Sequence, residues 1–124
     1  MTFDRYRCTR LVLDCLCSFD DLSMGRMSVA ICSILAAKIS TAETTVLGST
    51  PKYMRKLLSI VRTKKEQQTV DITLKFTLSA LWNLTDESPD TCGVFLREGG
   101  LDLFLQVLEQ FPGEPTVETK VRIP

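Results

Sequence analysis

The side chains best suited to binding chemistry lie within five residues of one another, at Trp82, Asn83 and Asp86. Because an α-helix turns by about 100° per residue, residues spaced by three and four share a face, so these three are expected to project together. An asparagine amide can donate to and accept from the backbone of an extended peptide. A carboxylate beside it can bind an ammonium group, and a flat indole can pack against a small residue. The spacing therefore predicts a site for a free peptide amino terminus with little or no side chain.

Two other interpretations of this segment stay open. Trp82 can be a core aromatic, with Asn83 as a helix C-cap and Asp86 as a surface charge, because Asp-Glu-Ser-Pro is also a common way to end one helix and start the next. Asp86 and Glu87 could instead form an acid–base pair. Adjacent residues on a helix point apart, however, so acid–base catalysis is not expected.

The residue inventory argues against metal binding and nucleophilic catalysis. The chain has no histidine, which excludes Cys-His and Ser-His-Asp chemistry within it. Two of its five cysteines, Cys15 and Cys17, lie about 200° apart around a helix and cannot both face one zinc ion. The odd number of cysteines fits a reducing compartment. All five are interpreted as small buried hydrophobes: Cys8, Cys15, Cys17, Cys32 and Cys92. We expect no metal, no cofactor and no enzyme activity.

Charge and hydropathy argue against two kinds of partner, nucleic acid and membranes. Fifteen basic and fifteen acidic side chains give a formal net charge of zero, so no net attraction to nucleic acid or an anionic membrane is expected. No apolar run approaches the ~20 residues needed to span a bilayer, and the first ten residues are charged where a secretory signal is apolar. With 44% hydrophobic residues, the chain is expected to form one soluble domain in the cytoplasm.

Apolar residues recur at helical spacing almost throughout, which predicts an all-α fold. The first helix is expected to bury Leu11, Val12, Cys15, Leu16 and Phe19, and the second Met27, Ile31, Ile34, Leu35 and Ile39. The predicted helices cover about residues 3–19, 23–39, 40–48, 51–63, 69–85, 89–96 and 101–111, and an eighth begins near residue 116.

Local signals mark several of these boundaries. Ser40 and Glu43 have the spacing of a capping box. Gly48 is expected as a left-handed C-cap, and Pro51 as the first residue of the next helix. The polar run 64–68 is expected to form a solvated turn, and Gly99-Gly100 to close the helix before it.

Similar segments recur along the chain, which indicates a repeat. Residues 51–58 align with 101–108 at an offset of 50, residues 69–71 with 116–118 at 47, and Leu35 with Leu81 at 46. These offsets are near the ~40 to 47 residues of armadillo and HEAT units. The expected fold is an armadillo-like helical repeat solenoid, a right-handed superhelix truncated at both ends. Its units are a partial one at about 1–40, a complete one at 41–85 and an incomplete one at 86–124. The exposed side of the last unit should present apolar surface that associates readily with other molecules.

Residues 70–89, together with 99–104 and 107–108 and reaching back through 32–40, resemble the armadillo region of the Zyg-eleven and Zer-one family. Gly99-Gly100 and Asp102 are closer to the Zer-one branch. This resemblance implies a substrate receptor of a cullin-two RING ubiquitin ligase that recognises glycine and other small residues at protein amino termini. It also implies that Trp82, Asn83 and Asp86 match the positions that bind such a terminus.

This chain departs from the pattern of that family in two respects. Family members carry an amino-terminal segment that docks elongin and cullin-two, followed by leucine-rich repeats, and nothing in this chain resembles either. Members also continue past the position of Val121 into a further long helix that adds polar groups to the site. We expect weak binding of such termini by this chain and no delivery to a ligase. The alternative is a generic armadillo scaffold, or an inactive remnant, that pairs with other helices.

Overall fold

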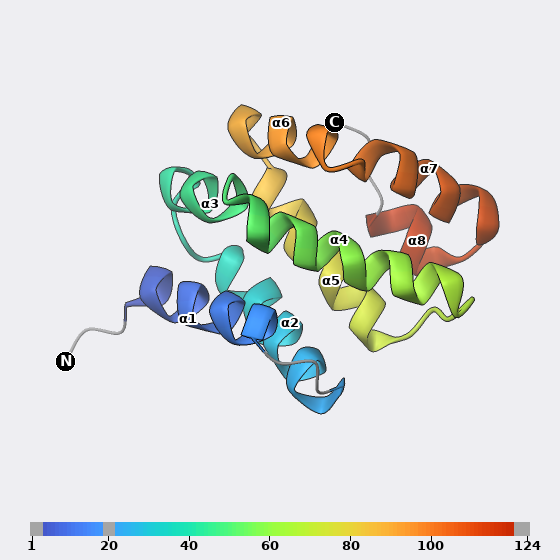
Figure 1. The fold of residues 1–124 in the computed structure, drawn as a ribbon, viewed down its shortest axis with the longest axis horizontal. Helices are drawn as coiled ribbons and strands as arrows, with labels where there is room; N and C mark the ends of the chain where they lie inside the picture. Colours follow the sequence, from blue (N-terminus) through green and yellow to red (C-terminus); the bar gives the residue numbers. More distant parts are fainter. Residues whose placement is uncertain (1–3, 19–21, 121–124) are drawn as a thin grey trace.

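The computed structural model describes residues 4–18 and 22–120, and within them it contains eight α-helices and no strand (Figure 1). The predicted all-α fold is confirmed. The ends of the first predicted helix, Phe3 and Phe19, and the residues after Lys120 lie outside the described ranges. The helices are α1 (Arg5–Ser18), α2 (Leu22–Ala36), α3 (Thr41–Gly48), α4 (Pro51–Glu66), α5 (Ile72–Thr85), α6 (Pro89–Arg97), α7 (Gly100–Gln110) and α8 (Pro115–Lys120).

The helices stack so that elements of equivalent position in successive units lie against one another (Figure 1). Helices α1, α4 and α7 follow one another in this order, with α4 in contact with both of the others. Likewise α5 contacts α2 and α8, and the two short helices α3 and α6 contact each other. Each unit covers the apolar face of the unit before it, which is how helical repeats share one core.

Burial tests the register of the repeat. The offset of 50 between α4 and α7 is confirmed, because buried residues recur at it in the pairs Tyr53 and Leu103, Met54 and Phe104, and Leu57 and Val107. Between α2 and α5 the offset is 45 rather than 46, in the pairs Val29 and Leu74, Cys32 and Thr77, and Ala36 and Leu81.

The offset of 47 predicted for the last unit is wrong. Buried Leu74 and buried Val117 are the third residues of α5 and α8, and they lie 43 positions apart. The difference arises because α7 has 11 residues where α4 has 16, so α8 begins about one turn early.

Local chemistry explains most helix starts. The capping box is present: the Ser40 hydroxyl accepts from the backbone N–H of Glu43 at 3.2 Å, and the Ser40 N–H donates to the Glu43 carboxylate at 3.0 Å. Pro51 is the first residue of α4, as predicted. Gly99 precedes α7 and has φ +81°, a backbone conformation that glycine adopts without the strain that a side chain would bring.

The solvated turn predicted at 64–68 is wrong for its first three residues, which form the last turn of α4. Lys64 Nζ lies 2.8 Å from Asp71 Oδ2, and the other Asp71 oxygen accepts from the Leu74 N–H at 3.0 Å. Asp71 thereby caps α5, so that helix begins at Ile72 rather than at Thr69. One carboxylate fixes both the end of α4 and the start of α5.

Gly48 does not form the predicted left-handed C-cap. It is the last helical residue of α3, and the chain passes on through Ser49 with right-handed dihedral angles. A β-carbon at Gly48 would lie 2.4 Å from Thr91 Cγ2 and 2.7 Å from Thr91 Oγ1. Glycine is therefore needed here for the close approach of α3 to α6.

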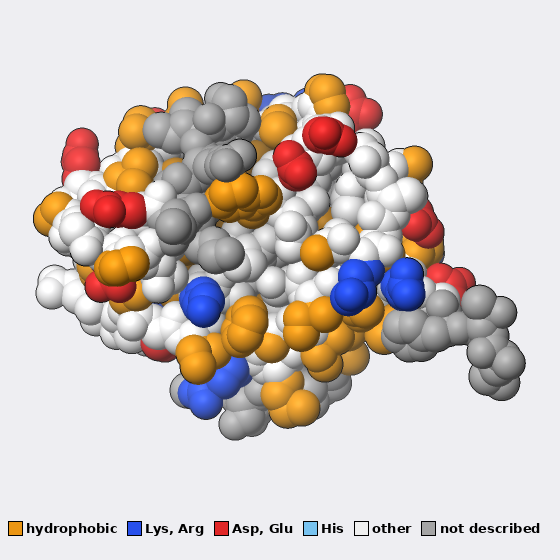
Figure 2. Space-filling model, turned by 180° about the vertical axis from the view of Figure 1, so that it is seen from behind, with side chains coloured by type: hydrophobic (Ala, Val, Ile, Leu, Met, Phe, Trp, Pro, Cys, Tyr) orange, Lys and Arg blue, Asp and Glu red, His pale blue; other side chains and the backbone are white. Residues whose placement is uncertain are grey.

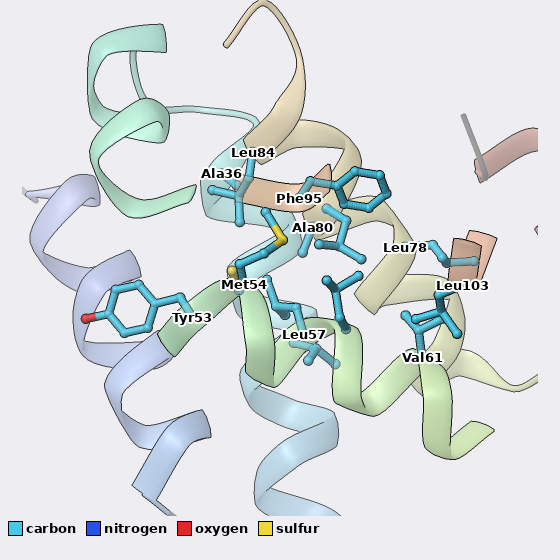
Figure 3. Packing of buried hydrophobic residues seen from close by; sticks show 14 of the residues in the cluster. Ala36, Tyr53, Met54, Leu57, Val61, Leu78, Ala80, Leu84, Phe95 and Leu103 are labelled. Carbon is cyan, nitrogen blue, oxygen red and sulfur yellow. The ribbon is translucent and has the colours of Figure 1, made fainter. Parts of the chain in front are cut away.

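The core is continuous from α1 to α8. Figure 3 shows Met54, Leu57 and Val61 of α4 directed toward Ala80 and Leu78 of α5. The ring of Phe95 meets that of Phe104 edge-on, with the centroids 4.9 Å apart, and covers the end of the core under α6 and α7.

In α1 and α2 the buried face of the helix differs from the predicted one. In α2 the core residues are Val29, Cys32, Leu35 and Ala36, whereas Met27, Ile31 and Ile34 are exposed. In α1 the buried residues are Thr9, Leu13 and Leu16, whereas Leu11 is exposed. Among the cysteines, Cys32 is buried as predicted, whereas Cys15 is exposed and the prediction is wrong for it. The remaining three are half-buried: Cys8, Cys17 and Cys92.

Candidate functional site

The candidate site lies on the face of α5 that is only partly buried. Leu74, Leu78 and Leu81 are buried on one side of this helix. Phe76 and Ser79, which lie on the opposite side at ~100° per residue, are half-buried. This half-buried face continues to the carboxyl end of α5, where the three predicted site residues are found.

Trp82 and Asn83 are half-buried in the last turn of α5, and Asp86 is exposed immediately after it. At a rise of about 1.5 Å per residue, Trp82 and Asp86 are separated by about 6 Å along the helix axis. An extended peptide advances about 3.4 Å per residue, so this distance corresponds to about two residues of a bound chain.

Asn83 is anchored to the neighbouring unit. Its Nδ2 donates a hydrogen bond to the backbone oxygen of Ser33 in α2 at 3.0 Å. This bond uses one of the two N–H groups of the amide nitrogen and fixes the orientation of the side chain. Position 83 therefore joins α2 to α5 and holds an amide at the boundary between two units, a contact that the sequence did not predict.

Asp86 is held by the backbone of the turn that follows α5. Its N–H donates to the carbonyl oxygen of Trp82 at 2.9 Å, which makes it the C-cap of the helix. The next residue, Glu87, has φ +55°, and Ser88 is buried. The Ser88 hydroxyl shares hydrogen bonds with the hydroxyls of Thr45 at 2.6 Å and Thr91 at 2.8 Å. The turn that carries Asp86 is therefore tied to α3 and α6.

This arrangement combines a partly exposed indole, an anchored amide and an exposed carboxylate around the end of one helix. A carboxylate forms its strongest hydrogen bonds with charged donors such as an ammonium group. An indole offers a rigid apolar wall to a small group. Groups of these kinds are the ones that a cationic group attached to a short chain would require.

Sequence reasoning missed the surface beside this site. The exposed residues Met27, Ile31 and Ile34 follow one face of α2, and Ile34 directly follows the Ser33 that accepts from Asn83. Their spacing of four and three residues was visible, but it is also the spacing of a core face. Figure 2 shows hydrophobic side chains gathered on the lower part of the face seen from behind, and acidic side chains higher on it.

A second polar cluster joins α1 to α4. The buried Tyr53 hydroxyl donates to Asp14 Oδ1, and Lys52 Nζ lies 3.4 Å from the same oxygen. The hydrogen bond from Tyr53 holds the pKa of the Asp14 carboxyl below its ordinary value of 3.8. Burial and the bond to Asp14 raise the pKa of Tyr53 to about 12. This cluster fastens α1 to α4.

Among the described residues no group of three or more acidic, cysteine or histidine side chains is arranged to hold a metal ion. The described helices also include none long and apolar enough to cross a membrane.

The stacked helical units define the class of protein: an all-α helical repeat domain of armadillo-like type. Residues 1–122 match the family model described as "Protein zer-1 homolog-like, C-terminal domain", and the chain belongs to this family. It is 35% identical to the protein zer-1 homolog of Homo sapiens over 92 residues, which are 74% of this chain and 12% of the relative. The Mus musculus homolog matches to the same extent. The Zyg eleven-related protein 1 of Caenorhabditis elegans is 38% identical over 58 residues, 47% of this chain and 6% of the relative. The chain thus spans about an eighth of the length of the zer-1 homologs it matches.

Proposed function

We propose that this chain recognises the free amino terminus of proteins that begin with glycine or another small residue. The observation that carries the proposal is the exposed carboxylate of Asp86 at the end of α5, within one turn of the half-buried Trp82. Membership of the zer-1 homolog-like family supports it, because the resemblance that led to these residues extends over most of the chain.

Each side chain has one task in this proposal. Asp86 receives the terminal ammonium group in a charge-assisted hydrogen bond. Asn83, fixed by Ser33, pairs with the first peptide group of the ligand, whose backbone would otherwise lose its hydrogen bonds to water. The indole of Trp82 packs against the first residue, and a large side chain at that position would be excluded.

In the wider context we propose that the chain is the substrate-recognition segment of a cullin-RING ubiquitin ligase receptor acting in the cytoplasm. In this role it selects the substrate and performs no catalytic step. Its relatives are much longer, since the match covers 12% of the human homolog, so docking to elongin and cullin-two would be a task of other regions.

A peptide titration tests the site. A peptide that begins with glycine should bind, and the same peptide with an acetylated amino terminus should bind more weakly, because acetylation removes the charge that Asp86 pairs with. Loss of a hydrogen bond to a charged group corresponds to roughly a 10- to 100-fold change in Kd. Asp86→Asn should weaken binding of the free peptide by a similar factor and leave the acetylated peptide unaffected.

Glu87→Gln is the matched control, because it removes the neighbouring exposed carboxylate and should leave binding unchanged. A peptide that begins with phenylalanine should bind less well than the glycine peptide. Equal binding of the free and acetylated peptides, or binding of neither, would instead favour the generic helical scaffold.

A further inference from the structure

A line of side chains joins the candidate site to the amino-terminal end of α5. Ile72, Ser79 and Asp86 are spaced by seven residues, and at ~100° per residue they fall within about 40° of one another around the helix. Ile72 is 59% exposed, although α5 contacts both α2 and α8. The stacking of neighbouring units therefore leaves this line of α5 open at its amino-terminal end.

Two exposed apolar residues of α2 occupy the same line. Burial pairs α2 with α5 at an offset of 45, which places Met27 at the position of Ile72 and Ile34 at that of Ser79. Met27 is 62% exposed and Ile34 is 55% exposed. Because α5 exposes Ile72 while it packs against helices of two other units, exposure belongs to this line in each unit. The apolar surface formed by Met27, Ile34 and Ile72 is called the α2–α5 surface below.

The α2–α5 surface is continuous with the candidate site. The backbone oxygen of Ser33, the residue before Ile34, accepts from Asn83 Nδ2 at 3.0 Å. Ile34 therefore lies next to the point where the amide of the site is anchored. A chain that leaves the site in the direction of α2 meets apolar side chains first.

Charge changes sign along this surface. Asp86 and Glu87 follow the carboxyl end of α5, whereas α2 and α5 themselves contain no acidic residue. Their basic residues, Arg26 and Lys75, are exposed in the amino-terminal half of each helix. A peptide that pairs its ammonium group with Asp86 would thus extend from negative charge toward positive charge. Basic side chains farther along such a peptide would be repelled.

Resting on the function proposed above, we propose that the α2–α5 surface binds the fourth and sixth side chains of a substrate, counted from its free amino terminus, and selects apolar over basic side chains there. Ser79 and Ile72 lie about 10 and 21 Å before Asp86 along the helix, at about 1.5 Å per residue. An extended chain covers about 10 Å in three residues and about 17 Å in five. The fourth residue therefore reaches the level of Ser79, and the sixth lies between Ser79 and Ile72. Alternate side chains of an extended peptide point the same way, so both can pack on the surface.

Fluorescence anisotropy with the full 124-residue chain tests the proposal on three peptides labelled at their carboxyl ends. Each begins with glycine and is otherwise serine, except that residues 4 and 6 are both serine, both leucine or both lysine. The leucine peptide should bind roughly 10-fold more tightly than the serine peptide, because apolar side chains leave water. The lysine peptide should bind more weakly than the serine peptide, and Lys75→Glu should remove that difference.

Substitutions on α2 connect the preference to this surface. In Met27→Ser/Ile34→Ser the advantage of leucine over serine should fall from roughly 10-fold to less than about 3-fold. Leu96→Ser is the matched control, because it removes a 48% exposed apolar side chain from α6, and it should retain the full advantage. Circular dichroism of each variant establishes that the helices are intact.

The outcomes separate this inference from the proposed function. A preference for free over acetylated glycine peptides, with equal binding of the leucine and serine peptides, would overturn the inference alone. A full leucine advantage in the α2 double variant would do the same. Binding of no glycine peptide would overturn both. Self-association of the chain that the double variant abolishes would assign the surface to a second copy, and it too would overturn the inference.

Discussion

Replacing Gly48 with alanine should destabilise the protein, although alanine is the better helix former. The added β-carbon would lie 2.4 Å from Thr91 Cγ2, and Thr91 is fully buried. Overpacking of this kind costs about 1–3 kcal/mol, against a gain of about 0.5–1 kcal/mol from alanine in a helix. We expect a net loss of about 1–2 kcal/mol in the free energy of unfolding, or a fall of roughly 4–8 °C in Tm for a domain of this size.

Urea and thermal unfolding of Gly48→Ala should be compared with the same change at Gly93. A β-carbon at Gly93 in α6 meets no atom within 4 Å, so Gly93→Ala should raise stability by about 0.5–1 kcal/mol. In a double-mutant cycle, Thr91→Ala should reduce the penalty at position 48. If Gly48→Ala stabilises the protein as much as Gly93→Ala does, the close contact between α3 and α6 is not present.

Two further predictions concern titratable groups. Tyr53→Phe removes the bond to Asp14 and should cost about 1–2 kcal/mol at neutral pH in urea unfolding. Since the folded-state pKa of Asp14 is lowered, its contribution is present above pH 3.8 and is lost on acidification below it, so the penalty should shrink toward pH 3, and a constant penalty would contradict this cause. In the folded protein iodoacetamide should modify exposed Cys15 but not Cys32, which is buried with a thiol pKa of about 12, and mass spectrometry of the digest would show it. Equal labelling of the two would contradict the packing of α2.

The helices could be predicted because their signals are local. The capping box at Ser40 and the proline at residue 51 act within one turn of the backbone, and the structure has both. The end of α4 depended instead on the ion pair between Lys64 and Asp71, which lie seven positions apart on either side of a turn. Composition alone made 64–66 look like a loop, because nothing in the run itself reveals that its lysine has a partner.

Core faces were harder to predict because two faces of one helix were both apolar. In α2 the spacing of Met27, Ile31 and Ile34 is as regular as that of Val29, Cys32 and Ala36, and periodicity cannot decide which set is buried. The choice is made by α1 and α5, which pack against the face with the smaller side chains.

In the candidate site, too, local features could be predicted from the sequence and contacts between distant residues could not. The spacing of Trp82, Asn83 and Asp86 predicted a shared site at the end of one helix, and all three lie at the carboxyl end of α5. It could not predict the bond from Asn83 to the carbonyl oxygen of Ser33, 50 residues away. Nor could it predict that the turn after Asp86 is fastened by hydroxyl groups. Such pairings depend on how successive units stack.

If the proposed site binds a peptide terminus, the bond between Asn83 and Ser33 makes its occupancy depend on the integrity of the array. A ligand that needs this amide in its fixed orientation binds the form in which α2 is docked on α5 and not the form in which the first helical pair has come away. By mass action it should then slow local opening of that pair and protect its amides from exchange with solvent. Conversely, mutations that loosen α1 and α2 would weaken recognition without touching any residue in contact with the ligand.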